Sequence, residues 1–222
     1  MQTLPLSADD LASLATRVYV RLRDAIAEGR LVAGERLSER GLAESFGVSP
    51  APVRDALHRL EAEGLVTTLP RRGSFVADLG PRKLRQMGRL RAALEGVAAG
   101  FAAEQATPDQ AAALRRHLHA VRDATQAGDL AALAAANDAL HAAILAIADH
   151  AVLARHLEAL RGYDHVTRRR ILAAAPEEPR RALREHAGIV SAIRRGDAAR
   201  AEARMRAHTL RSLSQIVEDT RP

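Results

Sequence analysis

Apolar residues in the first third of the chain recur at three- and four-residue spacing, which is the spacing of one face of a helix. The first such face consists of Leu14, Val18, Leu22 and Ile26. A second run of this kind ends at Gly47 and a third ends at Gly64. Glycine adopts the left-handed backbone that stops a helix without strain. The pattern therefore predicts three helices before residue 65.

Polar residues mark where the second and third helices start. Ser38 precedes the second apolar run, and its hydroxyl can accept from the free amides of the first turn. Ser49 stands in the same relation to the third run and is predicted as a second N-cap. Pro50 and Pro52 follow it within one turn, where amides lack intrahelical partners and proline is tolerated.

A short hairpin is predicted after the third helix. Residues 67–69 and 74–77 indicate two strands, and the turn between them carries Arg71 and Arg72. Helix, glycine turn, helix and basic hairpin form the layout of a winged helix-turn-helix, in which the third helix enters the major groove of DNA. Arg54 on that helix suits guanine, and Arg40 suits phosphate. The competing interpretation is a solvated helical hairpin with scattered arginines.

The rest of the chain has helical patterning only. We predict a mostly α protein with a tail at 1–11, a winged helix-turn-helix at 12–77, a hinge at 78–82 and an all-α domain at 83–222. Breakers and N-caps divide this second domain into six helices that would form a bundle. The predicted helices are 83–105, 107–127, 129–148, 151–174, 178–195 and 197–218.

Composition narrows the class of protein. The chain has no cysteine, which excludes disulfides and thiolate metal sites. No signal peptide pattern is present and we expect no apolar run long enough to span a membrane, so we expect a cytoplasmic protein. Residues 12–78 carry ten Lys/Arg and nine Asp/Glu, whereas 79–222 carry 23 and 16. The net charge of +6 therefore does not locate the DNA site, and the basic second domain suits an anionic effector.

Residues 18–76 resemble the GntR family of bacterial transcription regulators. The matching positions are Ile26 to Gly29, Gly34, Leu37, Glu39, Leu42-Ala43, Phe46-Gly47-Val48-Ser49, Pro52 to Leu57, Leu60, Glu63-Gly64-Leu65, Gly73, Phe75 and Val76. The resemblance implies DNA contacts by Arg40 and Arg54, and by Arg72 and Gly73 in the wing. Ser49 and Ala51 are also predicted to lie at the DNA, and the positions of Pro50 and Ala51 touch DNA in relatives. Pro50 and Ala51 depart from the arginine and hydroxyl residue that are common there, so the operator sequence does not carry over.

Residues 82–210 resemble the FCD effector domain of the FadR branch of that family, and six helices indicate its shorter, VanR-like type. The resemblance implies a divalent metal held by Asn137, His141, His186 and His208. It also implies a role for Arg91 in binding the effector, although Arg91 can instead pair with Glu95 four residues on. Three imidazoles and an amide oxygen suit zinc, nickel or another borderline divalent ion. Unrelated core or surface histidines are the competing interpretation.

These features favour a ligand-responsive regulator, most simply a repressor. It would bind a near-palindromic double-stranded operator as a homodimer, and a small carboxylate bound at the metal would change its DNA affinity. A metal sensor, in which the ion itself is the signal, is the first alternative. A metal-dependent enzyme fused to a DNA-binding head is the second, but no general base or nucleophile motif accompanies the histidines.

Overall fold

The computed structural model describes residues 8–174 and 177–218. The chain forms two compact units. The N-terminal unit comprises the described residues up to Gly80 together with Glu158–Val166, and the helical unit comprises Pro81–Leu157 and the described residues from Thr167 onward. The change of unit at Gly80 falls inside the predicted hinge, whereas nothing in the sequence pattern indicated that Glu158–Val166 would pack with the N-terminal unit.

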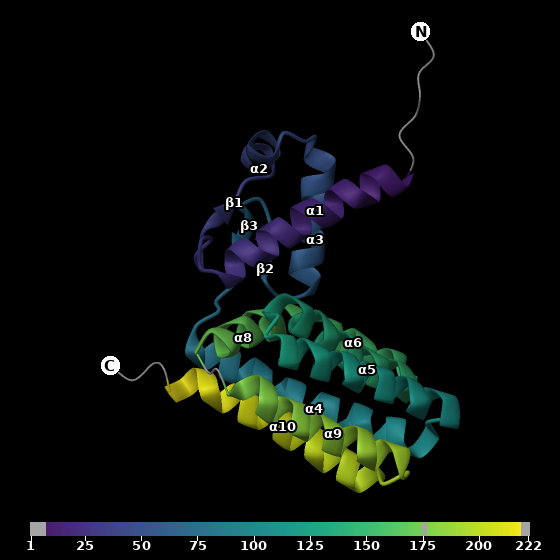
Figure 1. Ribbon diagram of the computed structural model, residues 1–222. Coiled ribbons are helices and arrows are strands. Elements are labelled where there is room, and N and C mark those ends of the chain that lie inside the picture. The colour runs from purple at the N-terminus through teal and green to yellow at the C-terminus, as the bar shows by residue number, and fades with distance from the viewer. Residues whose placement is uncertain (1–7, 175–176, 219–222) are drawn as a thin grey trace. The chain divides into compact units, whose positions relative to one another are not determined.

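The N-terminal unit contains the three predicted helices, α1 (Ala8–Ala27), α2 (Glu39–Phe46) and α3 (Pro50–Ala62). Helix α1 crosses and packs against α3 (Figure 1). Their facing apolar side chains are almost fully buried: Val18, Leu22, Ile26, Val53, Leu57 and Leu60. Helix α1 begins at Ala8, so the predicted tail at 1–11 was too long. The sequence between Leu6 and Gly29 contains no glycine or proline, so no helix breaker delays the start of the helix.

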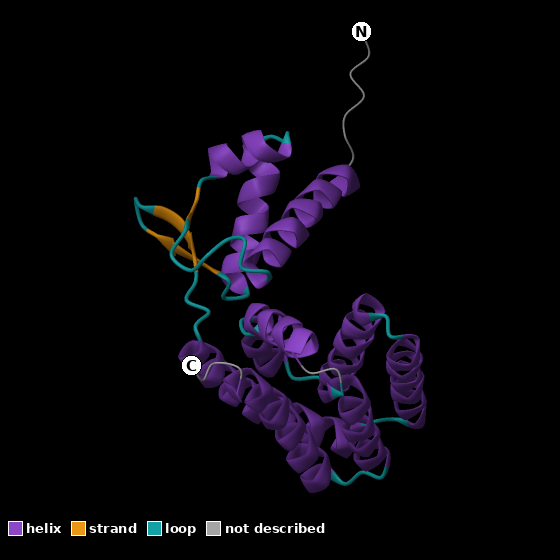
Figure 2. Cartoon of the chain, turned by 60° about the vertical axis from the view of Figure 1, so that its left-hand side comes forward, coloured by secondary structure: helices purple, strands orange, loops and turns teal. Residues whose placement is uncertain are grey.

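A three-stranded antiparallel sheet completes this unit, with β1 (Arg36–Leu37), β2 (Val66–Leu69) and β3 (Gly73–Val76) in the order β1-β3-β2. Figure 2 shows the strands in orange beside the helices of this unit. Leu69 pairs with Gly73 at the turn, which fixes the predicted hairpin. Strand β1 was predicted only as an extended connection, because two residues are too few to show an alternating pattern.

The described part of the chain after residue 80 contains seven helices rather than the predicted six. They are α4 (Pro81–Gln105), α5 (Pro108–Ala127), α6 (Leu130–Ala148), α7 (Ala151–Glu158), α8 (Arg161–Ala174), α9 (Glu178–Arg194) and α10 (Ala198–Glu218). The helix predicted at 151–174 is interrupted between α7 and α8. There the amide of Gly162 donates to the carbonyl of Glu63 at 3.1 Å instead of to its own helix. This tertiary hydrogen bond has no sequence signature, and the helix count no longer supports the VanR-like type.

Helix α4 packs along α10, and α5 packs against α6 and α9 (Figure 1). Small residues on α4 allow α10 to approach closely. A Cβ on Gly96 would lie 3.2 Å from the carbonyl oxygen of Glu202. The bundle core contains Leu114, Val121, Leu133, Leu140, Ile144, Ile189, Ile193 and Met205, all at most 2% exposed.

Helix α6 is long and apolar enough to cross a membrane by length and composition, with a mean hydropathy of 1.7. The expectation that no such run exists was therefore wrong. Alanines contribute much of this hydropathy, and one face of α6 packs into the bundle core through Leu133, Leu140 and Ile144. A buried core helix passes the same test, so this helix alone is weak evidence for a membrane span.

Candidate DNA-binding and metal-binding sites

Helix α3 separates its side chains as a DNA-reading helix requires. Val53, Leu57 and Leu60 are at most 2% exposed, whereas Arg54, Asp55, His58 and Arg59 on the other face are exposed. The C-terminal end of α3 is fixed by Glu63, which is 1% exposed. Its carboxylate accepts from the Tyr19 hydroxyl at 2.7 and 2.9 Å, and the guanidinium of Arg59 lies 3.8 Å from the centre of the Tyr19 ring. The recognition helix is thus anchored to α1 by a buried polar contact.

The two arginines predicted to contact DNA are exposed and already paired with carboxylates. Arg54 Nε donates to Glu39 at 3.1 Å, and Arg40 Nε donates to Glu44 at 2.9 Å. All four side chains are at least 43% exposed. Because exposed ion pairs contribute only about 0–1 kcal/mol, a phosphate or a guanine edge can replace either carboxylate at small cost.

Ser49 and Ala51 lie at the exposed start of α3. Ser49 occupies the N-cap position of α3, as predicted, although its hydroxyl makes no capping hydrogen bond. Pro52, three residues after Ser49, has no amide hydrogen, so one of the two amides from which a capping hydroxyl usually accepts is missing. The serine hydroxyl is therefore not used by the helix.

The wing presents Arg71 and Arg72, which are both exposed, next to Gly73. Arg71 has a φ of 62°, a left-handed conformation that is uncommon for a residue with a side chain. The sequence did not indicate that Arg36 belongs to the wing. Arg36 lies on β1, opposite Phe75 on β3. Its guanidinium lies close to Gly73, where an added Cβ would be 3.5 Å from Arg36 Nε. The sheet thus brings a further cation to the wing.

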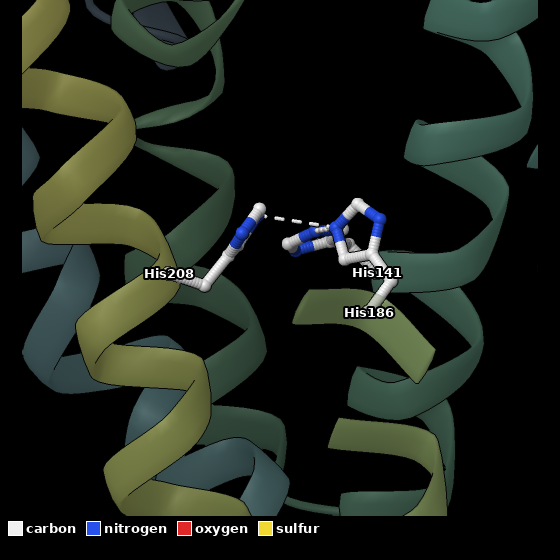
Figure 3. A group of neighbouring side chains, drawn as sticks. All are labelled: His141, His186 and His208. Carbon is white, nitrogen blue, oxygen red and sulfur yellow. Dashed lines mark hydrogen bonds between the residues drawn. The ribbon is translucent and has the colours of Figure 1, made fainter. Parts of the chain in front are cut away.

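Three of the four predicted metal ligands meet in the helical unit. His141 on α6, His186 on α9 and His208 on α10 point their rings toward one another (Figure 3). His186 Nε2 lies 3.2 Å from His141 Nε2 and 3.1 Å from His208 Nε2. Two nitrogens bonded to one ion at about 2.1 Å lie about 3.0–3.4 Å apart, so these separations fit a shared ion.

Two carboxylates, which the sequence did not indicate as part of this cluster, orient two of the rings. Glu95 on α4 faces His141 Nδ1 at 3.0 Å, and Glu185 on α9 faces His208 Nδ1 at 2.7 Å. An ionised carboxylate only accepts, so each Nδ1 carries the proton and, in a neutral ring, each Nε2 keeps a lone pair. His186 Nε2 has at most one hydrogen to share between two lone pairs. A cation at the centre resolves this conflict.

The pKa values of His186 and His208 favour neutral rings, and those of Glu95 and Glu185 favour ionised carboxylates. Burial lowers the pKa of His186 well below 6.5, and burial also lowers the pKa of His208. Burial alone would raise the pKa of Glu185, but hydrogen bonds from His208 and Arg211 bring it down to about 2. Burial likewise opposes ionisation of Glu95, yet the charge of Arg91 and the contact with His141 hold its pKa well below 4.5.

Asn137, the fourth predicted ligand, is 8% exposed and lies one turn before His141 on α6. Its Oδ1 atom is buried and has no hydrogen-bond partner among the described residues. A buried carbonyl oxygen without a partner is costly, which makes this atom available as a ligand. His186 Nδ1 is also buried without a hydrogen bond to any described residue.

Arg91 donates to Glu95 at 3.0 Å, with both side chains nearly buried at 13% and 11% exposure. This is the ion pair that the i, i+4 spacing allowed as an alternative to ligand binding. Because Glu95 also holds His141, Arg91 joins the histidine cluster through a carboxylate. Arg168 on α8 pairs with Asp138, whereas the side chains of Arg169 and Arg170 lie outside the described residues.

Comparison with known proteins agrees with both halves of this description. Residues 14–76 match the family of bacterial regulatory proteins, gntR family, and residues 86–211 match the FCD domain. The HTH-type transcriptional repressor RspR of Escherichia coli K12 is 31% identical, covering 92% of this chain and 89% of that protein. A probable D-xylose utilization operon transcriptional repressor of Paenarthrobacter nicotinovorans is 33% identical, covering 87% and 86%.

The solved structure of E. coli McbR/YncC has the same fold, with a TM-score of 0.76 and 25% identity over 94% of this chain and 99% of that one. The relatives that match along most of the chain are named as transcriptional regulators, not as enzymes. With a winged helix-turn-helix followed by an FCD domain, this chain belongs to the GntR family of bacterial transcription regulators.

Proposed function

We propose that this regulator is a repressor that binds a near-palindromic operator as a homodimer and responds to a small organic acid bound at a metal in the helical unit. It acts in the cytoplasm, where such operators are found. The observation that carries the effector half is the convergence of three histidine rings, two of which are held from behind by carboxylates.

The cluster fits a divalent ion of the zinc or nickel type, held by His141, His186 and His208 with Asn137 Oδ1 as the fourth donor. When bound, the ion would supply a Lewis-acid centre for an oxygen of the acid. Glu95 and Glu185 would fix the tautomers of His141 and His208, as carboxylates behind metal-binding histidines do. Neutral Asn137 adds no negative charge to the site, which favours an anionic ligand.

Exposed apolar side chains on α4 and α10 support a homodimer through these helices. Leu90 and Val97 lie two turns apart on α4, and Leu210 lies on α10, with exposures of 49%, 36% and 36%. Replacing Leu90 or Leu210 with glutamate should shift the protein from dimer to monomer in sedimentation velocity. Val152→Glu changes a residue that is 50% exposed on α7 and should leave the dimer intact. A protein that is monomeric before any substitution refutes this part of the proposal.

The DNA half is tested with an operator selected in vitro from random duplexes. Arg54→Ala should weaken specific binding by about 1–3 kcal/mol, because it removes a base-reading guanidinium. Arg116→Ala removes an exposed arginine from α5 and should leave affinity unchanged. Equal affinity of the Arg54 variant and the wild type would contradict the recognition-helix assignment.

The metal half is tested by metal analysis of the purified protein and by operator binding before and after chelation. The double variant His141→Ala with His208→Ala should lose the metal, whereas exposed His119→Ala should keep it. A metal sensor is the second candidate, favoured by the same cluster. It would change DNA affinity on reversible loss of the ion alone, whereas the proposed regulator requires an acid as well.

A further inference from the structure

Two arginines bring positive charge to the histidine cluster, and each is already paired with a carboxylate. Arg91 on α4 is 13% exposed and Arg168 on α8 is 17% exposed. A bound acid needs one such guanidinium, since its planar fork matches a carboxylate. The two arginines differ in the carboxylate that an incoming acid would have to displace.

Glu95, the carboxylate paired with Arg91, has further contacts within the site. Glu95 is buried, and the same oxygen that accepts from Arg91 also holds His141 Nδ1, each at 3.0 Å. Its other oxygen accepts from the Thr209 hydroxyl at 2.7 Å. Removing Arg91 from this carboxylate would leave a buried charge without its cation, which is strongly unfavourable. It would also loosen the acceptor that orients a metal-binding ring.

Asp138, a carboxylate paired with Arg168, is exchangeable. Asp138 has a side chain that is 53% exposed, so water compensates it when the ion pair opens. Asp138 lies directly after Asn137 and one helical turn before His141 on α6, which places the Arg168 guanidinium beside the helix that carries these ligands. The cation is also close enough to His186 that, after burial and the neighbouring histidines, its charge contributes to lowering the pKa of that ring.

We infer that Arg168, rather than Arg91, binds the carboxylate of the effector, and that Asp138 occupies this anion site until the acid replaces it. Arg91 is then a positioning residue that acts on His141 through Glu95. The inference rests on the proposed function, since it deepens the effector site of the same regulator. The ligand class is a small acid with one carboxylate for Arg168 and a second oxygen for the metal, as in hydroxy acids and sugar acids.

The test uses the zinc-loaded full chain and four acids: glycolate, L-lactate, succinate and D-gluconate. D-Glucitol, which carries an alcohol in place of the gluconate carboxylate, is the uncharged control ligand. Titration calorimetry gives the affinity for each acid, and zinc content is measured on the same samples. The variants are Arg168→Gln, Asp138→Asn and Arg91→Gln, with Arg116→Gln on the exposed face of α5 as the matched control.

Arg168→Gln should weaken binding of the responsive acid about tenfold or more at unchanged zinc content, because a charge-assisted bidentate contact is lost. Asp138→Asn should strengthen it about two- to fivefold, because the internal competitor is removed. A misfolded variant cannot produce that gain. Arg91→Gln should weaken zinc binding itself.

Unchanged acid affinity in both Arg168→Gln and Asp138→Asn overturns the inference. So does loss of acid affinity in Arg91→Gln at full zinc content. Failure of the proposed function has a different signature: wild-type protein that holds no zinc, or zinc-loaded wild type and Asp138→Asn that both ignore all four acids. The inference falls with that result.

Discussion

Glu185→Gln is the substitution that isolates what a carboxylate does behind a histidine of the proposed metal site. Glu185 Oε2 accepts from His208 Nδ1 at 2.7 Å, and Oε1 accepts from Arg211 Nε at 2.5 Å. Glutamine has the same shape but no charge, and it has only one acceptor oxygen. The variant therefore keeps the packing and weakens the contact that fixes the His208 tautomer.

The magnitude follows from the change in hydrogen-bond type. A hydrogen bond to a charged group contributes about 1.5–3 kcal/mol, and a neutral one about 0.5–1.5 kcal/mol. The difference of about 1–1.5 kcal/mol corresponds to a zinc affinity about five- to twelvefold weaker. This agrees with the lower part of the range of about 10–100-fold that is typical for such outer contacts.

The assay is competition for zinc against a chromophoric chelator at pH 7.5, with Glu178→Gln as the matched control. Glu178 also accepts from Arg211, at 2.6 and 2.7 Å, but among the described contacts it does not touch a histidine of the cluster. Glu178→Gln should lower stability and leave the zinc affinity of the folded protein unchanged. Equal zinc affinity in the two variants would refute the reasoning.

Three further results are expected. Gly162→Ala should destabilise the N-terminal unit by about 1–3 kcal/mol in thermal unfolding. The new Cβ would lie 2.6 Å from the carbonyl oxygen of Glu63, a backbone atom that cannot rotate away. An unchanged Tm would contradict the close contact between Gly162 and Glu63. Metal-free protein should lose stability as pH falls below 6.5, by up to about 1.4 kcal/mol per pH unit. The reason is that His186 binds a proton in the unfolded chain, whereas burial lowers its pKa in the folded protein and keeps it neutral. Urea unfolding at pH 7.5 and 5.5 measures this loss, which His186→Asn should reduce and exposed His119→Gln should not. Chelation should lower stability by about 4 kcal/mol if free zinc had stood a thousandfold above its Kd, and a curve that chelation does not move would argue against the site.

Local rules were sufficient for the DNA-reading unit. Spacing of apolar residues, glycine stops and the basic turn predicted α1, α2, α3 and the hairpin, because each depends on neighbours a few residues away. The N-cap position of Ser49 was also predicted correctly, but its hydroxyl makes no capping hydrogen bond, and Pro52 lacks one of the amides that it could use.

The sequence, with the family resemblance, also placed His141, His186 and His208 on three helices, but only tertiary structure decided what surrounds them. Glu95 and Glu185 reach the cluster from α4 and α9, and no spacing in the chain connects either one to the ring it holds. The break between α7 and α8 has the same origin, since the amide of Gly162 bonds to Glu63, about a hundred residues earlier in the chain. Contacts between residues far apart in sequence depend on how helices pack, and packing is a property of the folded chain as a whole.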